Sequence, residues 1–111
     1  MGYRSTVVLA INKEAIAKAI VDKGLPGILN EADEHYTDPE TAQYWVFMNR
    51  KWYDTYEDIS RLLSFLGKLS DDDYGYIRSG EENGDVESLG NPWNYDMSTV
   101  TYISSPIGDF S

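Results

Sequence analysis

Carboxylates in the last third of the chain are the residues whose types and spacing could do chemistry. Seven of them lie between positions 71 and 87, in a run of three followed by a run of four: Asp71, Asp72, Asp73, Glu81, Glu82, Asp85 and Glu87. Grouped carboxylates can face a cationic surface, ligate a divalent cation or act as general acid and base. We expect the first, because a dense acidic surface can imitate duplex DNA, which carries one negative charge per ~1.7 Å of its axis.

A predicted β-hairpin carries the second run of carboxylates. Asn83-Gly84 lies between two extended segments, 74–82 and 85–89, and this dipeptide favours a two-residue type I′ turn. Such a turn places Glu82 directly opposite Asp85, where like charges destabilise a hairpin. A cationic partner would offset that repulsion. The alternative is a solvated loop that only keeps the protein soluble.

The same carboxylates do not match the spacing of a calcium loop. An EF-hand needs glycine at its sixth position, but after Asp71-x-Asp73 the glycine comes fifth, and the series that starts at position 81 has a valine at its sixth. His35 is the only histidine, and the chain has no nucleophile elbow, P-loop or dinucleotide fingerprint. We therefore expect no catalytic residue, no cofactor and no metal, although a weak calcium site stays open.

Aromatic residues near the acidic segment are candidate anchors for a partner, since tyrosine and tryptophan are common hot-spot residues. The three candidates are Trp52, Trp93 and Tyr95. The first lies at a crowded strand-to-helix corner, and the other two follow a proline in a predicted loop. Core packing is the alternative for each of them, and it is what we expect for Trp45 and Phe47.

Composition limits the function classes further. The chain has 111 residues, 41% of them hydrophobic, which fits one domain with an ordinary core. It has no cysteine, which excludes a disulfide scaffold, a thiol nucleophile and a cysteine-ligated metal. No apolar run is long enough to span a bilayer and no signal pattern opens the chain, so we expect a cytoplasmic protein without membrane contact.

Charge is distributed unevenly along the chain. Nine Lys and Arg oppose nineteen Asp and Glu, for a net charge of −10, and the segments 1–30, 31–70 and 71–111 carry +2, −4 and −8. This balance argues against direct binding of nucleic acid through bulk charge. It indicates instead a protein partner with a basic surface, such as a nucleic-acid-binding protein.

Hydrophobic patterning in the first half predicts the elements that position these side chains. Residues 3–11 form a strand that is apolar on both faces near its end, as in a central strand. Asn12 caps a helix over 13–23, in which Ile16 and Ile20 follow helical spacing, and Gly24 ends it. Residues 28–34 are either a further helical turn or the lead into a strand.

The second half continues the alternation of strands and helices. A turn at 38–41 leads into a long strand over 42–53, and a helix capped by Asp54 or Thr55 follows. Its core-facing stripe is formed by Ile59, Leu62, Leu63 and Leu66. After the hairpin, 96–104 reads as one more strand.

These elements predict an α+β fold, with an antiparallel or mixed sheet and two helices packed on one face; a ferredoxin-like variant is one candidate. We expect a single domain over 1–104 and a flexible tail over 105–111.

Three motifs are similar to those of a known protein group. They are MGYRS at 1–5, KWYD at 51–54 and DDYGYIR-x-GE at 72–81. The chain resembles, over 1–11 and 50–90, small acidic single-domain accessory proteins of tailed bacteriophages. That group has no assigned enzymatic activity, so the resemblance implies an accessory protein in a bacterial host and transfers no catalytic residue. Many such proteins bind and disable a host factor.

The leading hypothesis is therefore an inhibitor or modulator of a host protein that uses the acidic segment, in one form as a DNA mimic. The second hypothesis is a structural or self-associating accessory protein, whose exposed strand edges would mediate a homodimer. An enzyme that acts through carboxylates is the third.

Overall fold

The computed structural model describes residues 2–82, 84–99 and 103–110. Its elements, in chain order, are β1 (Ser5–Asn12), α1 (Lys13–Asp22), η1 (Gly27–Glu31), β2 (Glu34–Thr37), β3 (Ala42–Arg50), α2 (Glu57–Gly67), η2 (Asp71–Asp73), β4 (Tyr74–Gly80), β5 (Val86–Gly90), η3 (Pro92–Tyr95), β6 (Ser98–Thr99), β7 (Ile103–Ser105) and β8 (Gly108–Phe110), where η denotes a 3-10 turn.

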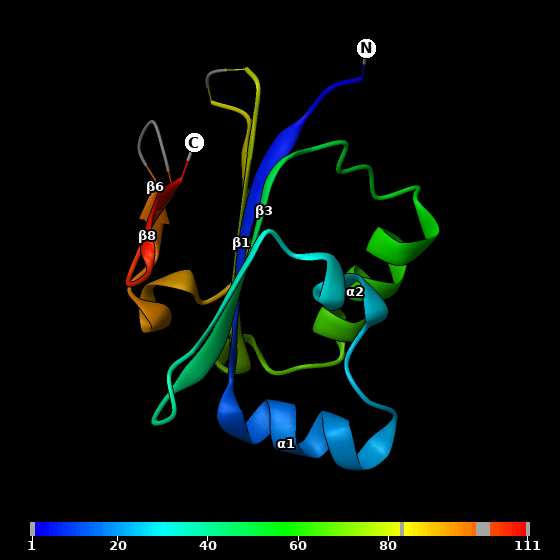
Figure 1. Cartoon of the computed structure of the whole chain (residues 1–111), viewed down its shortest axis with the longest axis vertical. Coiled ribbons are helices and arrows are strands. Elements are labelled where there is room, and N and C mark those ends of the chain that lie inside the picture. Colours follow the sequence, from blue (N-terminus) through cyan, green and yellow to red (C-terminus); the bar gives the residue numbers. More distant parts are fainter. Residues whose placement is uncertain (1, 83, 100–102, 111) are drawn as a thin grey trace.

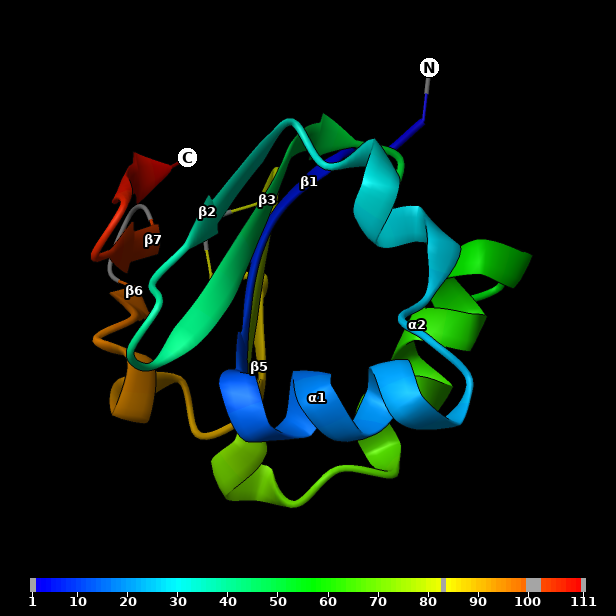
Figure 2. The ribbon, with the colours of Figure 1, turned by 60° about the horizontal axis from the view of Figure 1, so that its bottom comes forward.

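A five-stranded sheet is the middle layer of three (Figure 1). Its strands lie in the order β2-β3-β1-β4-β5, and neighbouring strands are antiparallel. Both helices cover one face, and a small sheet of β6, β7 and β8 covers the other (Figure 2). The predicted α+β fold with two helices on one face is confirmed. The order β2-β3-β1-β4 is that of a ferredoxin-like β-α-β-β-α-β arrangement, extended by β5.

β1 is the central strand, as its sequence predicts. Residues 7–11 are 0% exposed, because odd positions face the helices and even positions face the small sheet. The helix after it also forms as expected: the Asn12 side chain accepts a hydrogen bond from the Ala15 amide at 2.8 Å, and Gly24 follows the helix with φ +83°. Ile20, which shares the helical spacing of Ile16, is nevertheless 64% exposed, since α1 lies across one end of the sheet (Figure 1).

α2 buries the predicted apolar stripe, but it begins later than expected. Ile59, Leu62 and Leu66 are buried against the sheet, and Leu63 is partly buried. The predicted caps are wrong: the helix starts at Glu57, and Tyr56 precedes it without a side-chain cap. The Tyr56 amide donates to the Tyr53 carbonyl at 3.0 Å, so a turn occupies the positions where the capping residues were expected. Glu57 and Asp58 give the first helical turn the negative charge that its dipole favours.

The C-terminal segment supplies a layer that the sequence did not predict. Residues 96–104 were expected to form one strand, but β6 and β7 pair antiparallel with each other; positions 100–102 lie outside the described residues. The expected tail at 105–111 instead includes β8, which pairs with β7. These strands bring Met97 and Ile103 onto the apolar second face of the main sheet. That face is apolar along β1, β3 and β4, so it needs such a cover.

Ile103 tests whether this cover contributes to stability. The residue is fully buried, so we expect Ile103→Ala to lower the free energy of unfolding by about 2–5 kcal/mol. The same substitution at the exposed Ile20 is the matched control, with an expected change within about 0.5 kcal/mol. Urea unfolding of both variants measures the difference. Equal effects would show that the C-terminal strands do not form part of the core.

Candidate binding surface at the β4–β5 hairpin

The register of the hairpin differs from the one predicted. Ser79 pairs with Val86, and the Gly80 amide donates to the Asp85 carbonyl at 2.8 Å. Asp85 therefore stands opposite Gly80, and the expected opposition of Glu82 and Asp85 is wrong. The reason is that β4 ends at Gly80, before Glu82, and that the Asp85 amide donates to the Glu82 carbonyl at 3.1 Å. The predicted turn type rests on Asn83, which lies outside the described residues.

A guanidinium group separates the carboxylates of the hairpin. Arg78 donates from Nη2 to Oδ1 of Asp85 at 2.9 Å and from Nη1 to Oδ2 at 3.3 Å. Its Nε lies 3.7 Å from a carboxylate oxygen of Glu87, and Nη1 also donates to the Ser5 hydroxyl at 3.0 Å. The hydrogen bond with Asp85 raises the pKa of Arg78, and the same bond is the main reason why the pKa of Asp85 is lowered.

Tyr3 closes this network from the other end of the chain. Its hydroxyl donates to Oδ2 of Asp85 at 2.5 Å and accepts the Glu82 amide at 3.0 Å. The hydrogen bond to the carboxylate raises the pKa of Tyr3. The Tyr3 amide in turn donates to the Tyr53 hydroxyl at 2.7 Å, which links the hairpin to the corner before α2. Sequence reasoning missed Tyr3, since nothing local indicates a contact with a residue 82 positions away.

Gly80 makes room for these contacts. A Cβ atom there would lie 2.2 Å from Oδ2 of Asp85 and 2.3 Å from the Tyr3 hydroxyl, distances that are far inside van der Waals contact. Glycine is therefore needed where the carboxylate and the phenol meet above the strand. We define the Tyr3 network as Tyr3, Arg78, Gly80 and Asp85.

The seven candidate carboxylates form two groups rather than one surface. β4 separates Asp71–Asp73 from the hairpin tip by about 20 Å, given about 3.3 Å per residue, and the two groups lie at opposite ends of the sheet (Figure 1). Asp72 accepts hydrogen bonds from the Asn91 and Asn94 side chains, and Asp73 accepts one from Asn12 at 3.1 Å. These two aspartates therefore hold η2 against its neighbours.

Two of the three aromatic candidates are buried. Trp52 is 7% exposed, packs on Phe47 and donates from Nε1 to the Tyr76 hydroxyl at 2.9 Å. Tyr95 is also 7% exposed; burial raises its pKa to about 12, and its hydroxyl donates to the Asp72 carbonyl at 2.7 Å. Neither side chain is accessible as an anchor.

Trp93 is the accessible candidate, with 68% of its surface exposed. It belongs to η3, whose Pro92 approaches Gly75 at the start of β4, so it lies beside η2 and far from the hairpin tip.

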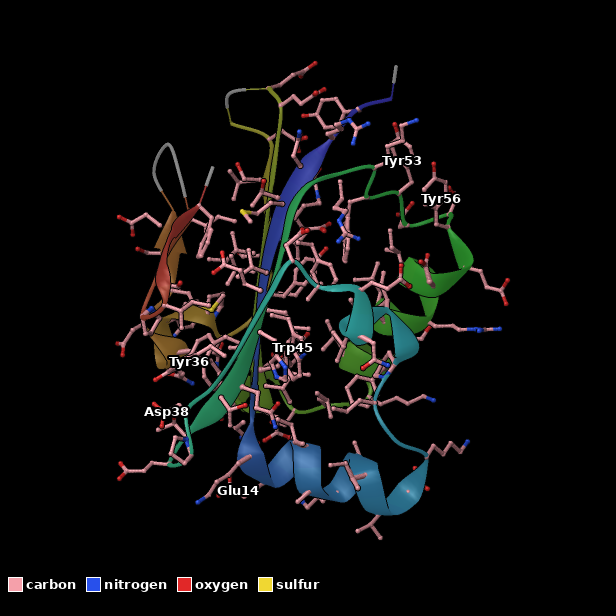
Figure 3. The ribbon with its side chains drawn as sticks, viewed as in Figure 1. Glu14, Tyr36, Asp38, Trp45, Tyr53 and Tyr56 are labelled. Carbon is pink, nitrogen blue, oxygen red and sulfur yellow. The ribbon has the colours of Figure 1, made fainter. Side chains whose placement is uncertain are left out.

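A cavity of about 270 Å³ opens beside the Tyr3 network. It lies between β4–β5 and the start of α2, on the helix-covered side of the sheet. Its lining consists of Tyr3, Trp52, Tyr53, Asp54, Ile59, Leu63, Tyr76, Arg78, Asp85 and Glu87. Figure 3 shows Tyr53 and Tyr56 at the corner before α2, close to the N-terminal segment. We call this space the hairpin cavity.

Among the described residues, no group of three or more histidine and carboxylate side chains is arranged to hold a metal ion. His35 stacks on Trp45 with ring centroids 5.0 Å apart and contacts Gln43, as a surface residue of β2. No helix of the described chain has the length and apolar character needed to cross a membrane.

No family model, curated protein or solved structure matches the chain.

The pKa of Asp85 offers a direct test of the network. Because its folded-state pKa lies below the ordinary 3.8, the carboxylate stabilises the folded protein above about pH 5, and this contribution is lost as the pH falls through the folded-state value. We expect an NMR titration to place the Asp85 midpoint below 3.8 in the wild type and higher in Arg78→Met. A midpoint that is the same in both proteins would contradict the ion pair.

Proposed function

We propose that this chain is a phage-type accessory protein that binds a host protein and modulates or inhibits it. The hairpin tip, with Glu81 and Glu82, is the contact surface, and the partner presents a basic surface such as one that binds nucleic acid. Both glutamates are exposed, and neither takes part in an ion pair within the described part of the chain. The Tyr3 network carries the proposal, because it neutralises Asp85 internally and leaves the tip charges to face outward.

The contacts that hold Glu82 and Asp85 support binding in addition to the charge of the tip. The Tyr3 hydroxyl holds the Glu82 amide, and Arg78 holds Asp85, so the loop has contacts on both of its sides. A partner that meets residues already held by such contacts loses less conformational entropy than one that must order them. The net charge of −10 would also speed the approach of a cationic partner at low salt.

Self-association remains the second candidate, and the edge strands favour it. All four residues of β2 are exposed, as are the first three of β5. Exposed edges of this kind can pair with another chain. A homodimer formed through them would need no host partner.

Recovery of partners from a bacterial lysate distinguishes the two candidates. We expect the immobilised wild type to retain host proteins at low salt and to release them at high salt, since exposed charge pairs are screened. Glu81→Gln with Glu82→Gln should lose the same proteins. Glu34→Gln with Glu40→Gln removes equal charge from exposed positions at β2 and its turn, and should retain them.

Two results would contradict the proposal. One is recovery of the same proteins by the tip variant. The other is recovery of none by the wild type together with a dimer mass in light scattering, which would favour self-association.

A further inference from the structure

The hairpin cavity joins aromatic rings with carboxylates in one small space. Three of its lining residues are acids, Asp54, Asp85 and Glu87, and one is a cation, Arg78, so the lining carries a net charge of −2. The rings come from Tyr3 and Tyr53, which are half-buried, and from Trp52 and Tyr76, which are buried. Tyrosine and tryptophan faces attract cations, and desolvation strengthens that attraction.

Arg78, the basic residue of the lining, already contacts other residues of the protein. The side chain of Arg78 is only 17% exposed and contacts Ser5, Asp85 and Glu87. An anion entering the cavity would therefore meet carboxylates without a free guanidinium. Asp54 is exposed and makes no hydrogen bond or ion pair with the described residues, and Glu87 reaches Arg78 only at 3.7 Å. Carboxylate oxygens thus remain available to a second cation.

The aromatic walls are held in place before any ligand arrives. Trp52 donates to the Tyr76 hydroxyl at 2.9 Å, and the Tyr53 hydroxyl accepts the Tyr3 amide at 2.7 Å. Burial raises the pKa of Tyr76 far above its ordinary value, so this hydroxyl stays protonated. Fixed ring planes favour a flat cation that can stack, and paired carboxylate oxygens favour one with several donors.

A neighbouring cavity shows that the negative charge is confined to the lining of the hairpin cavity. Trp52 and Ile59 also line a cavity of about 440 Å³ on the side of η1. Its charged lining residues are Arg4, Glu31, Arg50, Lys51 and Asp58, a balance of +1. Cations therefore gather on one side of Trp52, and the site open to a further cation lies on the other.

We infer that the hairpin cavity receives the guanidinium group of one arginine side chain of the partner protein. Asp54 and Glu87 accept its hydrogen bonds, and the rings of Tyr3 and Tyr53 stack against its plane. The inference rests on the proposed function and deepens it, because the tip glutamates would attract a basic surface while the cavity selects one residue on it.

Binding of a neutral-ended arginine probe tests the site. We expect N-acetyl-arginine methylamide to shift the Trp52 indole resonance in a saturable way in NMR spectra. The citrulline analogue, which keeps the shape without the charge, should bind at least about tenfold more weakly. The lysine analogue should also bind more weakly, since its ammonium cannot stack or donate in a fork. Saturable shifts of equal strength with citrulline or lysine would overturn the assignment.

Variants locate the site within the protein. Asp54→Asn and Glu87→Gln keep the side-chain shapes, and each should weaken the arginine probe several-fold; Glu34→Gln, on β2, should leave it unchanged. Unchanged affinity in both cavity variants, with their spectra showing a folded protein, would contradict the inference.

The two proposals can fail separately. If the arginine probe binds in the cavity but the tip variant recovers the same host proteins, the tip proposal is wrong and the arginine site stands. If the tip variant loses its partners but the probe causes no saturable shift, the arginine site is wrong and the tip proposal stands.

Discussion

The ion pair between Arg78 and Asp85 is the interaction on which the acidic end of this molecule depends. The hairpin brings several carboxylates together, and the last third of the chain has a single basic residue to oppose them. Arg78 contacts Asp85 through two nitrogens and approaches Glu87 with the third. Like charges are thereby joined through one guanidinium instead of facing each other. A lysine has one nitrogen and could not span both carboxylates in this way.

Contacts extend from this pair into the rest of the fold. Tyr3 joins Asp85 to the N-terminal segment and to Tyr53, and Trp52 joins the same corner to Tyr76 on β4. The close approach of carboxylate and phenol requires a glycine at position 80. One connected set of side chains therefore orders the hairpin, seats the chain before α2 and forms the walls of the cavity.

Local sequence patterns predicted the helices and main strands well, because the residues that stabilise such an element lie within it or next to it in the sequence. Asn12 can cap only the helix that follows it, and the stripe from Ile59 to Leu66 has one buried side whatever it packs against. Pairing between distant segments is different. Asn83-Gly84 marks a reversal without specifying which residues pair across it, and the predicted register was two residues from the observed one.

In the candidate site, too, local features are predictable from the sequence, whereas features that depend on distant segments are not. The sequence places the acidic residues close together between positions 71 and 87, but their separation into two groups follows from the length and direction of β4. Trp52 and Trp93 are chemically identical in the sequence; tertiary packing buries the first and exposes the second. Arg78 is the single basic residue among nine acids in its third of the chain, so the sequence predicts that it pairs with a nearby carboxylate. The partner of Arg78 depends on the hairpin register.

Amide hydrogen exchange of the hairpin in the wild type and in Arg78→Met tests this account most directly. The Gly80 amide donates to the Asp85 carbonyl, and the Glu82 amide donates to the Tyr3 hydroxyl. We expect both amides to be protected in the wild type and to exchange much faster in the variant, while amides between β1 and β3 stay protected in both. Equal protection of Gly80 and Glu82 in the two proteins would show that the hairpin does not depend on the ion pair, and would contradict the account.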